Sequence, residues 1–98
     1  MEILQSRIES ILRTEDIESL FQHGAPSDEY SLEARAIVAA VARLSPQDAT
    51  EGLIADLILN IWNHAFGPFS DYDLDLRRPT FQSVARQMLV AQPPEQPT

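Results

Sequence analysis

Apolar residues recur at three- and four-residue spacing along most of the chain, which is the period of amphipathic α-helices. The first stripe predicts a helix over 2–13, and Thr14 then favours the start of a second short helix that runs to about His23. The two segments are also compatible with one bent helix, because no residue between them forces a break. A histidine, a glycine and a proline within 23–26 indicate that helical structure ends there.

Two long helices follow in the middle of the chain. Ser31 is a suitable N-cap for a helix that ends at Leu44, and its apolar stripe comprises Tyr30, Ala34, Ile37, Val41 and Leu44. The Ser-Pro-Gln-Asp segment at 45–48 predicts the start of the next helix, with proline at the first helical position and an acid in the first turn. Gly67 and Pro68 indicate that this helix ends at Phe66.

The helix predicted over 46–66 is apolar on nearly every side between Leu53 and Trp62. Only Asp56, Asn60 and Asn63 interrupt this pattern, and they form one narrow polar stripe. A helix of this kind is usually surrounded by others. We therefore expect it to be the central and most buried helix of the molecule.

The remaining segments complete an all-α prediction. Residues 67–78 are polar and without a sustained period, which predicts a loop, and a last helix starts near Pro79 or Thr80. Its apolar face consists of Phe81, Val84, Ala85, Met88 and Leu89. The tail 92–98 holds three prolines and is predicted to be disordered. We expect a single domain over 1–91, built as a compact bundle of four to five helices.

Charge and the lack of cysteine narrow the functional classes. The 98 residues carry a net charge of −8, which disfavours binding to nucleic acids or to anionic membranes. No cysteine is present, so disulfides, thiolate zinc sites and a cysteine nucleophile are excluded. We expect a cytoplasmic protein, because neither a secretory signal nor an apolar stretch long enough to cross a membrane is visible.

No catalytic, cofactor or metal motif is complete. His23 and His64 each precede a glycine at the end of a predicted helix, where an imidazolium interacts favourably with the helix dipole. The Asp71-x-Asp73-x-Asp75 segment resembles the opening of a calcium loop, but it lacks the glycine and the distal glutamate that such a loop requires. We expect no cofactor and no metal.

Two acidic segments are candidate binding sites. In 24–30, Asp28 and Glu29 precede Tyr30, and this arrangement favours either a loop that supports the fold, with Tyr30 in the core, or an exposed acid–aromatic patch for a partner. Asp71 and Asp73 form the second candidate, as a solvated acidic loop that pairs with the neighbouring arginines or contacts a partner.

One part of the sequence resembles a known group of proteins. The pattern Gly24-x-Pro26-x-Asp28-Glu29-Tyr30-x-x-Glu33-Ala34-x-x-Ile37, followed by Trp62-x-x-x-Phe66-Gly67, looks like a group of small bacterial helical domains of unknown function. The resemblance covers roughly residues 14–89, and the Pro-x-Asp-Glu-Tyr segment is its specific part. It implies the helical fold and a bacterial cytoplasm, and it implies no activity or functional residues.

The sequence favours a non-catalytic module that binds a protein partner, and the acidic surface favours a basic one. Helical immunity proteins, which neutralise bacterial toxins, are likewise small and acidic, although this is an analogy at the level of the fold. The alternative is an enzyme, or a small enzyme subunit, that uses carboxylates such as Asp28, Glu29 and Asp56. The sequence does not specify the oligomeric state.

Overall fold

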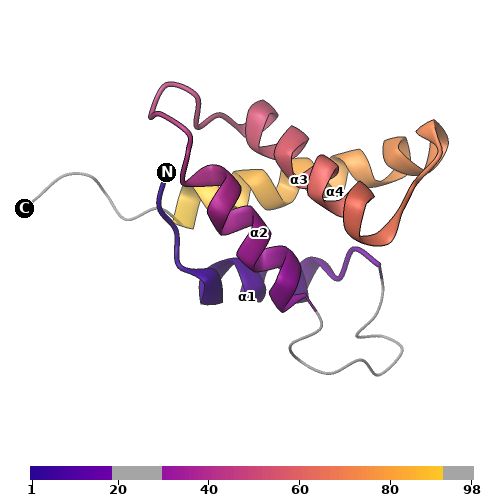
Figure 1. The fold of residues 1–98 in the computed structure, drawn as a ribbon, viewed down its shortest axis with the longest axis horizontal. Helices are drawn as coiled ribbons and strands as arrows, with labels where there is room; N and C mark the ends of the chain where they lie inside the picture. Colours follow the sequence, from indigo (N-terminus) through magenta and orange to yellow (C-terminus); the bar gives the residue numbers. More distant parts are fainter. Residues whose placement is uncertain (19–29, 92–98) are drawn as a thin grey trace, which may run out of the picture.

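Four α-helices make up the described part of the chain, residues 1–18 and 30–91 of a computed structural model. They are α1 (Gln5–Glu15), α2 (Ser31–Val41), α3 (Glu51–Phe66) and α4 (Asp71–Ala91). Figure 1 shows two helix pairs, α1 with α2 and α3 with α4, and contacts between α2 and α3 and between α1 and α4 join the pairs. The described residues contain no strand, so the all-α prediction is confirmed.

Helix α1 continues through the position where a second helix was predicted to start. Thr14 lies inside α1, and its hydroxyl donates to the Ser10 carbonyl oxygen at 3.0 Å, so the predicted N-cap at Thr14 is wrong. A threonine hydroxyl can bond the carbonyl one turn earlier instead of capping the next helix. The helix ends at Asp16, which has a left-handed φ of 44° and donates its backbone N–H to Leu12.

Helices α2 and α3 begin at other residues than predicted. Ser31 is the first residue of α2 and Tyr30 takes the N-cap position. Helix α3 begins at Glu51, with the Thr50 hydroxyl accepting a hydrogen bond from the Leu53 amide, so the predicted start at 45–48 is wrong. The 45–48 segment is a turn in which the Asp48 amide donates to the Ser45 carbonyl oxygen at 3.0 Å. Serine followed by proline is also typical of the first two positions of a β-turn.

The predicted loop over 67–78 is wrong for its second part, because α4 already begins at Asp71. The Ser70 hydroxyl accepts a hydrogen bond from the Asp73 amide at 3.1 Å, and two aspartates in the first turn complement the helix dipole. Pro79, which was predicted to mark the helix start, lies inside α4. Both Pro79 and Asp75, whose carbonyl lacks its usual helical donor, are exposed, so water can satisfy that carbonyl.

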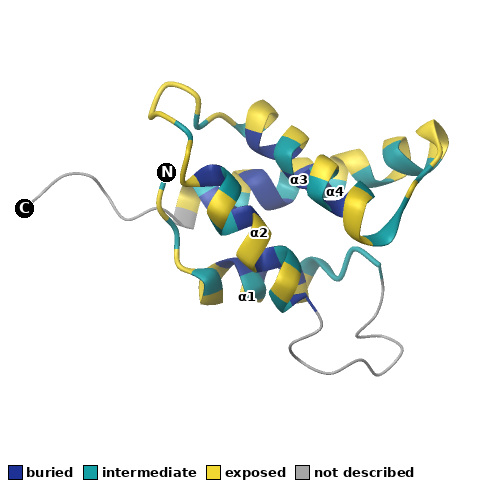
Figure 2. Cartoon of the chain, viewed as in Figure 1, coloured by how far each residue is buried: buried dark blue, intermediate teal, exposed yellow. Residues whose placement is uncertain are grey.

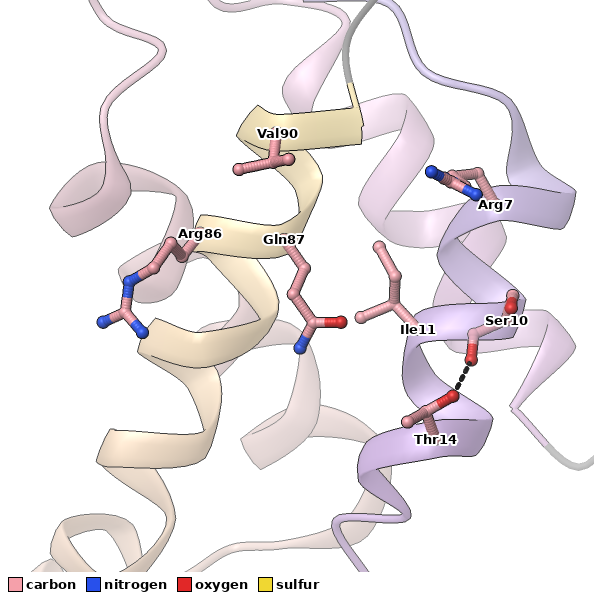
Figure 3. Close-up of a pocket in the computed structure, with 7 residues that line it drawn as sticks. All are labelled: Arg7, Ser10, Ile11, Thr14, Arg86, Gln87 and Val90. Atoms are coloured by element: carbon pink, nitrogen blue, oxygen red, sulfur yellow. Dashed lines mark hydrogen bonds between the residues drawn. The ribbon is translucent and has the colours of Figure 1, made fainter.

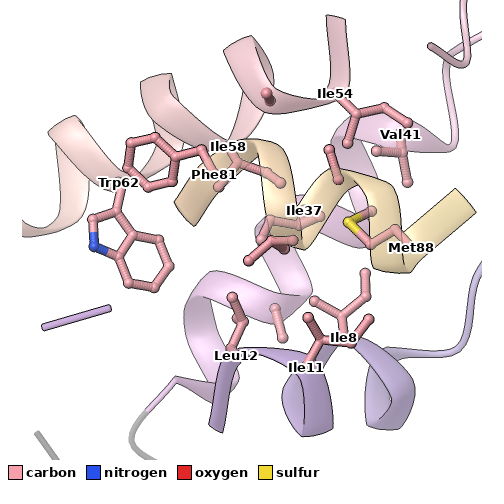
Figure 4. Close-up of a cluster of buried hydrophobic side chains, with 14 of the residues drawn as sticks. Ile8, Ile11, Leu12, Ile37, Val41, Ile54, Ile58, Trp62, Phe81 and Met88 are labelled. Carbon is pink, nitrogen blue, oxygen red and sulfur yellow. The ribbon is translucent and has the colours of Figure 1, made fainter. Parts of the chain in front are cut away.

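Every helix contributes side chains to one hydrophobic core (Figure 4). The fully buried side chains with the largest volumes are Trp62, Tyr30, Phe81, Ile8, Leu12, Ile37, Ile54, Ile58, Met88, Val41 and Val84. Helix α3 buries one face, as its neighbours do, while Leu53 is 38% exposed and Leu57 and Ile61 are half-buried. The prediction of a surrounded central helix is therefore wrong, because a small bundle leaves part of its apolar surface exposed.

Candidate protein-interaction surface

The first two turns of α4 expose two large apolar side chains beside two carboxylates. Tyr72 is 70% exposed and Leu76 is 59% exposed, and they lie one helical turn apart on the same side of the helix. Asp71 and Asp75 are exposed as well, with the same spacing, on the adjacent strip of the helix surface. Figure 2 shows only exposed and intermediate residues in this part of α4. We call the four side chains of Asp71, Tyr72, Asp75 and Leu76 the α4 face.

The structure separates the two aspartates that the sequence analysis selected in this segment. Asp71 belongs to the α4 face, whereas Asp73 is half-buried and lies farther around the helix, on the side of Arg77. The Arg77 guanidinium donates to the Asp73 carbonyl oxygen at 3.1 Å. Arg78 pairs with Asp75 at 3.5 Å, and both side chains are well exposed, so this pair contributes little to stability.

A polar cluster holds the N-terminal half of α4 against the bundle. Arg77 donates two hydrogen bonds to the Glu18 carboxylate, from Nε at 2.7 Å and from Nη2 at 2.8 Å. The Trp62 indole donates to Glu18 Oε2 at 2.8 Å, and the guanidinium carbon of Arg77 lies 4.2 Å from the centre of the Phe69 ring. Bidentate pairs of this kind fix orientation as well as distance.

The electrostatics of this cluster follow from its hydrogen bonds. The bonds from Arg77 lower the pKa of the Glu18 carboxyl, with a further contribution from the Trp62 indole, and burial of the carboxyl only partly opposes them. The same pair raises the pKa of Arg77. Both groups are therefore charged at neutral pH, and their pairing joins the end of the 1–18 segment to α3 and α4.

Tyr30 belongs to the core, which was one of the two alternatives for the 24–30 segment. Its side chain is only 1% exposed, and its ring centre lies 5.4 Å from that of Trp62 and 6.3 Å from that of Phe66. The Tyr30 hydroxyl donates to Asp16 Oδ1 at 2.9 Å and accepts from the Glu18 amide at 3.2 Å. Asp28 and Glu29, the other candidate residues of this segment, lie outside the described residues, and so does His23.

The polar stripe of α3 combines exposed and half-buried residues, and Asn60 lines a hollow of about 390 Å³ between α2 and α3. Asp56 and Asn60 are exposed, and the half-buried Asn63 accepts a hydrogen bond from the Phe69 amide at 2.8 Å. Asn63 thereby fixes the short connection to α4. His64 lies in the last turn of α3, as predicted from its position before Gly67, and its side chain is exposed. No group of three or more metal-ligating side chains occurs within residues 1–18 and 30–91.

A shallow hollow of about 370 Å³ between α1 and α4 also lacks a convergent set of polar groups (Figure 3). Arg86 turns away from it toward Glu51, with an Nε–Oε1 distance of 3.2 Å. Gln87 donates to the Glu15 carboxylate at 2.6 Å, and the Thr14 hydroxyl bonds within its own helix. The side chains of Thr14, Arg86 and Gln87 are thus engaged in contacts within the fold.

Tyr72 and Leu76 of the α4 face and the Glu18–Arg77–Trp62 cluster are the features that sequence reasoning missed. Glu18 lies 44 residues from Trp62 and 59 from Arg77, so no local pattern connects them. A local signal for the α4 face did exist. Ser70 followed by acids is a typical helix N-terminus, and it would have placed Tyr72 and Leu76 one turn apart.

Within the described residues no helix is long and apolar enough to cross a membrane. The resemblance to small bacterial helical domains stays a prediction. Comparison with known proteins adds no relative, because no family model, no curated protein and no solved structure matches this chain.

Proposed function

We propose that this chain is a non-catalytic, cytoplasmic module that binds a basic protein partner through the α4 face. The observation that carries the proposal is the exposure of Tyr72 and Leu76, one helical turn apart and beside Asp71 and Asp75. A single exposed leucine is common in folded proteins and requires no explanation. An aromatic and an aliphatic side chain at i and i+4 have the spacing with which helices anchor themselves in a partner's groove.

The chemistry of the α4 face supports a protein partner. Tyrosine is enriched at protein interfaces and among the residues that dominate binding energy. The face lies on a helix that the Glu18–Arg77 pair fixes to the bundle. Binding therefore costs little backbone conformational entropy. The absence of cysteine agrees with a reducing compartment.

The charge of the chain supports a basic partner. The net charge is −8, and Asp71 and Asp75 place exposed carboxylates next to the apolar pair. A negative surface accelerates the encounter with a positive partner and repels acidic competitors. Asp71 and Asp75 therefore increase the association rate and the selectivity, and Tyr72 and Leu76 form the contact that is buried on binding.

The test is affinity capture from the source cells with the full chain, followed by direct measurement of binding to the captured protein. We expect the double variant Tyr72→Ala/Leu76→Ala to bind at least about tenfold more weakly than the wild type, since two interface anchors are lost. Leu32→Ala is the matched control, because Leu32 is 70% exposed on α2 and far from the α4 face in sequence. All three proteins should melt at the same temperature within a few degrees.

The charge contribution is tested on the same complex. Asp71→Asn/Asp75→Asn should slow association, and the effect should shrink as salt is added, because salt screens exposed charges. Asp56→Asn, an exposed aspartate on α3, serves as the control. Wild-type affinity of the Tyr72→Ala/Leu76→Ala variant, or capture of no protein above background, would remove the α4 face as a binding site.

A further inference from the structure

A second, chemically different surface lies between the segment that leads into α1 and the end of α2. It is a hollow of about 700 Å³, lined by apolar side chains that include Ile3, Leu4 and Val38, together with Ala42. Leu4 is 75% exposed. The volume lies within the range of roughly 300–1,000 Å³ that is usual for small-molecule sites in proteins.

Two cationic side chains accompany this apolar hollow. Arg7 lines it directly and is exposed. Arg35 is also exposed and precedes Val38 by three residues and Ala42 by seven, so it lies on the same stripe of α2. Among the described residues neither arginine forms an ion pair, whereas Arg13, Arg77, Arg78 and Arg86 do. The one acidic side chain in the lining is Glu2.

We propose that this hollow binds a medium-chain amphiphile with an anionic head group, such as a fatty carboxylate. The hydrocarbon chain lies against the apolar lining and the head group pairs with Arg7. A small amphiphile fits the hollow, because its volume is that of a small-molecule site and its lining is mostly apolar. The site is independent of the α4 face, so the two proposals can fail separately.

The probe is sodium dodecanoate below its micelle concentration, added to the isotope-labelled full chain and followed by NMR. We expect saturable binding of one molecule, with the largest shifts at Leu4, Arg7 and Val38. Ala42→Trp, which adds bulk at an exposed position of the lining, should weaken binding at least tenfold. Ala39→Trp is the matched control, because Ala39 is an exposed alanine of α2 outside the lining, and it should leave the affinity unchanged.

Charge variants test the head group. Arg7→Gln should weaken binding of dodecanoate about two- to fivefold, as expected for an exposed ion pair, and Glu2→Gln should strengthen it. Dodecyltrimethylammonium, with the same chain and a cationic head, should bind more weakly than dodecanoate. The proposal is overturned by a lack of saturable binding, by equal binding of the cationic amphiphile, or by an affinity that Ala42→Trp does not change. Shifts at the same residues that depend only on protein concentration would assign the hollow to a second copy of the chain instead.

Discussion

The two halves of α4 belong to one helix, but they are held in place by different forces. After Pro79, the side chains of Phe81, Val84 and Met88 are fully buried, and apolar packing fixes this half. Before Pro79, no side chain is fully buried, and the pair between Arg77 and Glu18 holds the helix to the bundle. Polar attachment on one side leaves the apolar side chains on the other side free to face solvent. In the second half the apolar side chains of the packed face turn inward, although Val90 at its end is 80% exposed.

Substitutions at Phe81 and Leu76 should show the largest difference between the two halves. Phe81→Ala removes a buried ring that lies 6.2 Å from the Trp62 ring centre and should lower the free energy of unfolding by about 3–5 kcal/mol. Leu76→Ala removes an exposed side chain and should change it by no more than about 0.5 kcal/mol. Urea denaturation measures both values. If Leu76→Ala lowers the free energy of unfolding by more than about 1 kcal/mol, the α4 face is packed against the fold and not exposed to solvent.

Substitutions at the neighbouring arginines Arg77 and Arg78 test how much the pair between Arg77 and Glu18 contributes to stability. Arg77→Met keeps the apolar stem but leaves the Glu18 carboxylate, whose side chain is 14% exposed, without its guanidinium. We expect a loss of about 1–3 kcal/mol in the free energy of unfolding, because a largely buried charge loses its partner. Arg78→Met breaks only the exposed contact with Asp75 and should cost less than about 1 kcal/mol. Equal effects of the two substitutions would mean that the polar cluster does not hold the helix.

The same attachment should weaken in acid. Because the pKa of Glu18 is lowered in the folded chain, the unfolded chain takes up this proton first as the pH falls. Its contribution is fully present above the ordinary glutamate pKa of about 4.3 and is lost as the pH falls through the lower, folded pKa. The measurement is the difference in unfolding free energy between wild type and Glu18→Gln from pH 7 down to pH 3. We expect it to shrink below about pH 4, and a constant difference would contradict the assignment to Glu18.

The half of α4 after Pro79 was predictable from the sequence, and the half before Pro79 was not. Phe81, Val84, Ala85 and Met88 repeat with the helical period, and burial follows from that period. The first half lacks such a period because its attachment depends on Glu18, 59 residues away in the chain. Because the local sequence does not reveal this partner, the three aspartates and the proline at 71–79 are typical of a loop. Asp71 was selected as a candidate site residue from its charge, while Tyr72 and Leu76 became candidates only once the segment was known to be helical.

The turn at 45–48 shows the same limit at a helix start. Ser45 and Pro46 satisfy the preferences of both a helix N-terminus and a β-turn, and the cap at Thr50 decides between them. Local residue preferences therefore located the buried faces of the helices, but they did not determine at which residues α3 and α4 begin.

Substitution of Pro79 should change the free energy of unfolding least, and it should raise this free energy where the other substitutions lower it. Pro79 has no N–H to donate to the Asp75 carbonyl, and both residues are exposed, so alanine can supply the missing hydrogen bond without disturbing the core. The net gain of one such bond is about 1 kcal/mol, reduced by the greater freedom of alanine in the unfolded chain. We expect Pro79→Ala to raise the free energy of unfolding by about 0.5 kcal/mol in urea denaturation. A clear loss would show that proline sets the direction of the first half of α4 toward Glu18, and combining Pro79→Ala with Arg77→Met would then give less than additive losses.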